Sequence, residues 1–132
     1  METNSNPLII ALTGATGSIY GLTLARKVLE AGISIHLLIS KSGQSIVEHE
    51  TDRSWNDWLA DLRKIGRIET PEIDNLGAAI SSGSYPTRGM VIAPCSMGSL
   101  GRIASGMSGN LIERAADVCL KERRQLLLLA RE

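Results

Sequence analysis

Two short apolar runs in this sequence each end in a turn of small polar residues that opens a helical stretch. The first run is Leu8 to Leu12, bounded by Pro7 and by Thr13-Gly14, and the second is Met90 to Ala93. Short apolar runs bounded by turn residues are typical of strands buried on both faces of a sheet. Such strands present their turns at the carboxyl edge of a parallel sheet. The sequence therefore predicts an α/β sheet with two polar turns at one edge.

The segments after the first turn complete a β-α-β unit. Ile19, Leu22, Ala25 and Leu29 recur at helical spacing before Gly32, and 33–39 forms a second apolar run. The short connection predicts parallel strands joined by a right-handed crossover. Further expected elements are helices from 40–43 toward 50, within 51–65, after the 94–99 turn and over 110–121, a short strand within 66–88, and an apolar run at 126–130. We expect an open parallel sheet in three αβα layers, Rossmann-like or flavodoxin-like, with 1–132 as a single domain.

Composition excludes several classes of function. The chain has 132 residues, 43% of them hydrophobic, and a formal net charge of zero, so nothing favours nucleic acid or an anionic membrane as a partner. Neither a membrane-spanning run nor a signal peptide is expected, which predicts a cytoplasmic protein. Cys95 and Cys119 lack metal-ligand spacing, so we expect reduced thiols and no metal site, with Cys119 in the core and Cys95 in the turn after 90–93.

Two other patterns are expected to be structural. Trp55, Trp58, Leu59 and Leu62 are spaced to share one helix face, which is more often core or subunit interface than a ligand platform. His36 lies in a predicted strand without motif spacing. We therefore expect neither pattern to belong to the site.

Glycines 14, 17 and 21 in the first turn favour a phosphate-bearing ligand over plain packing. Glycine lets the backbone approach a phosphate, and the following helix offers free N–H groups. A nicotinamide-binding turn expects an acidic residue after the second strand, where this chain has Ser40 and Lys41. These suit a phosphate or a flavin better than an NAD ribose, and NADP stays open. Neither Tyr20 nor Tyr85 has a lysine four residues on, which counts against a dehydrogenase.

Arg114, Asp117 and Lys121 are expected on one face of the helix over 110–121. For an isolated helix, a solvated row of ion pairs is the favoured interpretation. A site that neutralises a phosphate is the alternative.

Taken together, these motifs resemble the flavin prenyltransferase family of UbiX/Pad1 type, formerly called aromatic acid decarboxylases. The matching segments are Thr13-Gly14-Ala15-Thr16-Gly17, Ser40-Lys41, Glu50-Thr51-Asp52, Ser81-Ser82-Gly83-Ser84, 90–97, and 110–118 continuing to Arg131-Glu132. The last segment is long and specific. Related cysteine decarboxylases carry a different turn where this chain has Pro94-Cys95-Ser96-Met97.

The resemblance implies an enzyme that joins the dimethylallyl group of dimethylallyl phosphate to N5 and C6 of reduced FMN. It implies a homo-oligomer whose product serves a partner decarboxylase. By the same resemblance, FMN would be held by Gly14, Ala15, Thr16, Ser40, Ser96, Met97, Gly98, Ser99 and Arg131. Glu50, Arg114, Lys121, Arg131 and Glu132 would line the prenyl-phosphate side, with Thr16, Glu50 and Glu132 as the catalytic candidates and no metal.

This sequence departs from the family pattern at two places. The family commonly has serine at the position of Thr16, which keeps the hydroxyl and adds a methyl group. Family chains also continue past the Arg-Glu pair with a strand, a phosphate-binding tyrosine and basic residue, and a final helix. We therefore keep an FMN-binding module without turnover as the alternative function, and an NADP-dependent reductase as a third.

Overall fold

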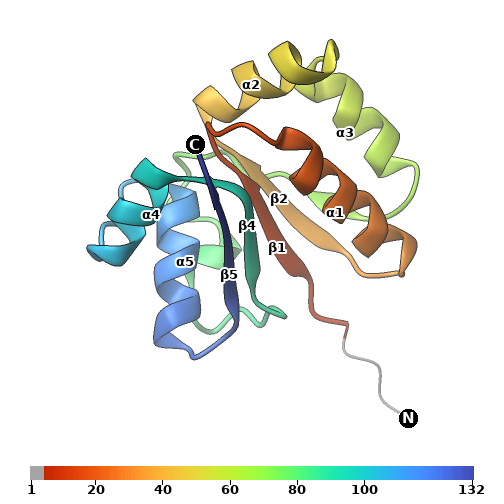
Figure 1. The fold of residues 1–132 in the computed structure, drawn as a ribbon. Coiled ribbons are helices and arrows are strands. Elements are labelled where there is room, and N and C mark those ends of the chain that lie inside the picture. Colours follow the sequence, from red (N-terminus) through yellow and green to blue (C-terminus); the bar gives the residue numbers. More distant parts are fainter. Residues whose placement is uncertain (1–4) are drawn as a thin grey trace.

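The computed structural model describes residues 5–132 and contains a parallel sheet of five strands in the order β3-β2-β1-β4-β5 (Figure 1). The strands are β1 Leu8–Leu12, β2 Ile35–Ile39, β3 Ile68–Glu69, β4 Met90–Ser96 and β5 Leu126–Arg131. Every neighbouring pair is parallel. The prediction of an open parallel α/β sheet is confirmed.

Helices cover both faces of this sheet. They are α1 Ser18–Glu30, α2 Lys41–Thr51, α3 Trp55–Arg63, the 3₁₀ turn η1 Ala79–Ser81, α4 Met97–Ala104 and α5 Leu111–Lys121. Helices α1, α2 and α3 lie on one side and α4 and α5 on the other (Figure 1). The three-layer arrangement is therefore also confirmed.

Side chains of β1 alternate between two separate cores, as the period of a strand requires. Ile10 and Leu12 pack with α1 and α3, whereas Ile9 and Ala11 pack with α5. Trp55, Leu59 and Leu62 are buried in the first core, so the tryptophan stripe is core. Cys95 and Cys119 are free and buried in the second core, as expected for Cys119, whereas Cys95 was expected in a turn and lies in β4.

One boundary differs from the sequence-based expectation. We expected a turn to begin at Pro94, but β4 continues through Cys95 to Ser96, with Cys95 paired to Ala130 and Ser96 to Arg131 of β5. The Ala93–Pro94 peptide bond is cis. The polar turn therefore starts later, and Ser96 caps α4 directly.

None of the helices formed by residues 5–132 combines the length and the apolar character needed to cross a bilayer.

Candidate functional site

The carboxyl ends of four neighbouring strands bring most of the predicted site residues to one edge of the sheet. The first turn follows β1, Ser40 follows β2, Met97 follows β4, and Arg131 ends β5. The chain leaves β1 toward one face and β4 toward the other, so β1 and β4 flank the position at which the topology switches. Ligands of open α/β sheets bind at this position. In Figure 1 the end of β5 lies beside the starts of α1 and α2.

Thr13 joins the ends of β1 and β4. Its side chain is buried, and its Oγ1 donates to the main-chain oxygen of Pro94 over 2.8 Å and accepts from the Ser96 N–H over 2.8 Å. The Thr13 N–H also donates to the Pro94 oxygen, over 3.1 Å. One threonine thus sets the separation of the two polar turns. We assigned Thr13 no role from the sequence, because its partners lie more than 80 residues away.

The end of β5 is bound to the same turn. The N–H and Oγ1 of Thr16 both donate to the main-chain oxygen of Glu132, over 3.0 and 2.7 Å. In return, Arg131 Nε donates to the Thr16 oxygen over 3.1 Å, and its guanidinium lies 5.1 Å from the centre of the Tyr20 ring. Thr16, Arg131 and Glu132 are therefore adjacent in the structure.

Glu50 occupies the amino terminus of α1. Its Oε1 accepts from the Ser18 N–H over 2.9 Å, and both carboxylate oxygens lie 3.2 Å from the Gly17 nitrogen. The hydrogen bond from Ser18 lowers the pKa of Glu50, with smaller contributions from Gly17 and from the charge of Arg131, against a desolvation that raises it. A fixed carboxylate thus sits where a helix amino terminus attracts an anion.

This arrangement corrects the phosphate site predicted at the glycine turn. The N–H groups of Gly17 and Ser18, which we expected to be free, already donate to Glu50. Gly14 and Gly21 serve packing: a Cβ on Gly14 would strike the Ser42 side chain, and one on Gly21 would strike the main-chain oxygen of Ala93. Gly17 has φ +97°, a conformation that favours glycine.

Two other helix starts at this edge are capped by predicted site residues. Ser40 Oγ accepts from the Gly43 N–H at the start of α2, and Ser96 Oγ accepts from the Ser99 N–H at the start of α4. The N–H groups of Gly43 and Ser99 are therefore satisfied by these caps. The first turns of α2 and α4 face the same edge of the sheet as the glycine turn. A hollow of about 450 Å³ adjoins the start of α2, lined by Ser40, Lys41, Ser42, Ile73, Asp74 and Asn110.

Arg102 is a cation at this edge that sequence reasoning missed. Its Nε donates to Oε2 of the buried Glu113 over 2.8 Å, and Nη2 lies 3.4 Å from Ser99 Oγ. Glu113 is held in turn by the Gly109 N–H over 3.0 Å. The pair spans a loop between α4 and α5, so no helical spacing signals it. It places a guanidinium beside the serines that cap α4.

Arg114 and Lys121 do not join this cluster within one chain. Arg114 Nε donates to the main-chain oxygen of Ser81 over 3.3 Å, and Lys121 ends α5 with an exposed side chain 3.9 Å from Glu122 Oε2. Helix α5 has 11 residues and is about 16 Å long. It ends just before β5 begins, whereas Arg131 ends β5. Lys121 and Arg131 therefore lie at opposite edges of the sheet.

The environment of Glu50 predicts an acid-dependent contribution to stability. A carboxyl group whose pKa is lowered by folding stabilises the fold above its ordinary pKa of about 4.3, and this contribution is lost as the pH falls through the folded value. Because Glu50 is exposed, we expect Glu50→Gln to cost only about 0.5 kcal/mol at neutral pH.

Urea denaturation of Glu50→Gln and the unmodified protein between neutral and acidic pH measures this. The difference should shrink as the pH falls through the lowered pKa of the folded Glu50 carboxyl group. Glu48→Gln, an exposed change on the same helix, is the matched control. A Glu50→Gln effect that is equal at both ends of the range would show that the charge of Glu50 does not stabilise α1.

Comparisons with known proteins agree with this geometry. A flavin prenyltransferase from Halalkalibacterium halodurans is 40% identical over 128 residues, which are 93% of this chain and 62% of that protein. A probable UbiX-like flavin prenyltransferase from Bacillus subtilis is 44% identical over 125 residues, 95% of this chain and 59% of that protein. The chain thus spans about 60% of the length of these curated relatives.

Solved structures of similar proteins share this fold. A crystal structure of AnUbiX (PadA1) in complex with FMN and dimethylallyl pyrophosphate has a TM-score of 0.89 and 36% identity, and covers 98% of this chain and 66% of its own. A dodecameric FMN-dependent UbiX-like decarboxylase from Escherichia coli O157:H7 has a TM-score of 0.88 and 39% identity, with 96% and 67% covered. The model of the Flavoprotein family matches residues 1–131, and the chain belongs to that family.

Proposed function

We propose that this chain forms the FMN site of a flavin prenyltransferase, which transfers a dimethylallyl group from dimethylallyl phosphate to reduced FMN. The observation that carries the proposal is the meeting of Thr16, Glu50 and Arg131 at the carboxyl edge of the sheet. By the family resemblance, Thr16 and Arg131 would hold FMN, and Glu50 and Arg131 would line the prenyl-phosphate side. Relatives of 40% and 44% identity bear the name flavin prenyltransferase. We further propose a single cytoplasmic domain.

The residues at this edge fit FMN. A flat ring system needs close approach of the backbone, which the exposed Gly98 in the first turn of α4 offers. The phosphate of FMN needs free N–H groups and hydroxyls, which the starts of α2 and α4 offer and the start of α1 does not. We therefore infer that Ser40, or Ser96 to Ser99 together with Arg102, bind the phosphate.

Reduced FMN supplies the nucleophilic N5 and C6 atoms in this chemistry. Transfer breaks the bond between the allylic carbon and the phosphate oxygen, and inorganic phosphate leaves. Arg131 is the cation placed to neutralise the leaving phosphate. Its Nε is fixed by the main-chain oxygen of Thr16, and its charge is close enough to Glu50 to lower the pKa of that carboxyl group. The Glu132 carboxylate is a candidate to accept the proton released when the second bond closes. Thr16, which contacts both Arg131 and Glu132, would position these two residues.

The rest of the predicted site requires a second copy of the chain. Because Lys121 and Arg131 lie at opposite edges of the sheet, both could line one phosphate site only if neighbouring subunits contribute one each. We propose a homo-oligomer on this ground, and the similar Escherichia coli protein is dodecameric. The prenylated flavin would then serve a partner decarboxylase.

Mass analysis of flavin extracted after anaerobic incubation with reduced FMN and dimethylallyl phosphate tests the proposal. We expect a flavin heavier by one C₅H₈ unit, formed with release of inorganic phosphate. The Arg131→Gln variant should form much less product for each FMN that it binds. Unmodified FMN alone, under conditions in which the Bacillus subtilis relative is active, would refute turnover by this chain.

An FMN-binding module without turnover is the second candidate. It is favoured by one observation: Arg114 and Lys121 do not join the cluster of Thr16, Glu50 and Arg131 within one chain. Tight FMN binding without product would support the module. Absence of FMN binding would exclude both candidates.

A further inference from the structure

Tyr20 is an aromatic residue at the same edge of the sheet as Arg131, and it has no assigned role. It lies in the first turn of α1, and its side chain is 48% exposed. The guanidinium carbon of Arg131 lies 5.1 Å from the centre of the Tyr20 ring. A cation within about 6 Å of a ring centre is attracted by the electrons of the ring face. Tyr20 is therefore in a position to hold Arg131.

Gly17 brings the two side chains together. A Cβ on Gly17 would lie 2.8 Å from Tyr20 Cδ2 and 2.9 Å from Arg131 Nε, so both side chains pack against the same Cα. The Tyr20 N–H also donates to the Gly17 oxygen over 3.0 Å, which fixes the first turn of α1. The ring and the guanidinium are thus held side by side by the backbone between them.

The two guanidinium groups at this edge have different partners. Arg102 Nε donates to the buried carboxylate of Glu113 over 2.8 Å, which offsets its charge. Among residues 5–132, no carboxylate forms an ion pair with Arg131. The nearby Glu50 carboxylate accepts from main-chain N–H groups instead. Arg131 is therefore the less neutralised of the two cations.

An aromatic partner also leaves donors of Arg131 available. A guanidinium carries several N–H donors in one plane. Nε of Arg131 donates to the main-chain oxygen of Thr16 over 3.1 Å, and no other group among residues 5–132 accepts from this side chain. The ring attracts the cation without being a carboxylate or carbonyl acceptor. Because two N–H groups of one guanidinium match two oxygens of a phosphate, the remaining donors suit a phosphate ester.

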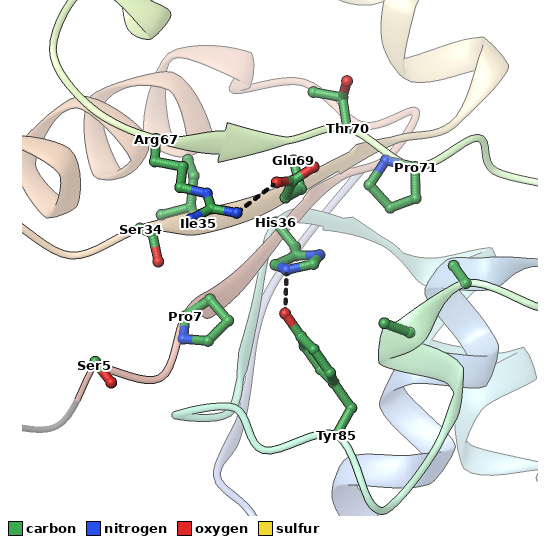
Figure 2. Close-up of a pocket in the computed structure, with 12 residues that line it drawn as sticks. Ser5, Pro7, Ser34, Ile35, His36, Arg67, Glu69, Thr70, Pro71 and Tyr85 are labelled. Carbon is green, nitrogen blue, oxygen red and sulfur yellow. Dashed lines mark hydrogen bonds and ion pairs between the residues drawn. The ribbon is translucent and has the colours of Figure 1, made fainter.

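The other tyrosine of the chain makes a different kind of contact. Tyr85 lies at the opposite edge of the sheet, near the start of β2, where its hydroxyl oxygen is 3.1 Å from His36 Nε2 (Figure 2). Among residues 5–132, the Tyr20 hydroxyl has no hydrogen-bond partner, and its ring makes the contact with Arg131. Phenylalanine should therefore substitute for Tyr20, whereas leucine should not.

We propose that Tyr20 is a positioning residue for Arg131. Its ring orients the guanidinium so that the N–H groups not used by Thr16 meet the phosphate of dimethylallyl phosphate. This inference rests on the proposed function. Negative charge grows on the leaving phosphate as the bond from the allylic carbon to oxygen breaks, so the position of the cation matters most in the transition state. Loss of the ring should therefore lower kcat more than it raises KM.

Steady-state prenyl transfer by three single variants measures this role. Tyr20→Leu should lower kcat for each bound FMN about three- to fivefold, the loss expected for a cation–π contact at an exposed site. Tyr20→Phe keeps the ring and should be close to the unmodified protein. Ile19→Ala changes an exposed neighbour in α1 and is the matched control, with no loss expected.

Nuclear magnetic resonance of the arginine side chains tests the contact without turnover. The Nε–H signal of Arg131 is identified by its absence from the Arg131→Gln variant. The ring should shift this signal in the unmodified protein and in Tyr20→Phe, and the shift should be lost in Tyr20→Leu. Titration with inorganic phosphate should then show an affinity about three- to fivefold lower in Tyr20→Leu.

The proposal is overturned if Tyr20→Leu leaves the Arg131 signal or the phosphate affinity unchanged. It is also overturned if Tyr20→Phe behaves like Tyr20→Leu, or if Ile19→Ala has the same effect as Tyr20→Leu. Absence of prenyl transfer by the unmodified protein would refute turnover by this chain. In that case the phosphate titration alone decides whether Tyr20 positions Arg131.

Discussion

The Gly21→Ala variant is expected to lose about 3 kcal/mol of unfolding free energy, although alanine is the better helix former. Gly21 is the position at which α1 crosses the end of β4. A Cβ there would overlap the main-chain oxygen of Ala93 and would lie 2.7 Å from Leu12 Cγ. Since the obstructing oxygen belongs to a strand inside the sheet, α1 would have to move outward. Urea denaturation measures the loss.

Gly101→Ala is the matched control for this prediction. Gly101 is in α4, and a Cβ on it would meet nothing within 4 Å. The same change should therefore stabilise the protein by about 0.5–1 kcal/mol. Opposite signs for the two variants would confirm that packing against β4, rather than helix propensity, requires glycine in α1. A stable Gly21→Ala protein would contradict the close approach of α1 and β4.

The Thr13→Val variant is expected to lose about 2 kcal/mol of stability and to bind FMN at least tenfold less tightly. Valine has nearly the shape of threonine but cannot accept from the half-buried Ser96 N–H, which lies 2.8 Å from Thr13 Oγ1. An unsatisfied N–H costs about 1–3 kcal/mol. Because Ser96 caps α4, the change would also displace the turn that we propose for FMN. Each tenfold loss of affinity corresponds to about 1.4 kcal/mol.

Denaturation and titration by flavin fluorescence measure the two effects separately. Thr23→Val, a half-buried threonine of α1, is the control and should change neither quantity appreciably. Unchanged FMN binding by Thr13→Val, together with the expected loss of stability, would argue that the start of α4 does not bind the flavin. The phosphate would then be assigned to Ser40 and the start of α2.

Glu50 occupies the position at the glycine turn where a phosphate would otherwise bind. In many α/β proteins the helix start after the first strand receives a phosphate. In this chain a carboxylate of the protein itself receives those N–H groups. A phosphate brought to the same place would meet a negative charge. The glycine turn, together with Ser40 and Lys41 at the end of β2, therefore does not indicate a site for NAD or NADP.

The sequence by itself determined the order of strands and helices and the edge at which the site forms. Apolar runs and helical spacings are local properties, and β1, β2, β4, α1 and α5 appear close to where these patterns predicted them. Once the strands are parallel, the residues that follow them meet at one edge whatever the details of packing. The positions of Thr16, Ser40, Ser96 and Arg131 were therefore predictable.

Only the tertiary structure decided which side chains touch. Glu50 reaches Gly17 across 33 residues, Thr13 reaches Ser96 across 83, and His36 meets Tyr85 across 49. Lys121 was separated from Arg131 because α5 runs back along the sheet before β5 returns to the site. No local spacing encodes these relations, because they depend on how whole helices pack on the sheet. That packing turned a predicted phosphate site into a carboxylate-capped turn.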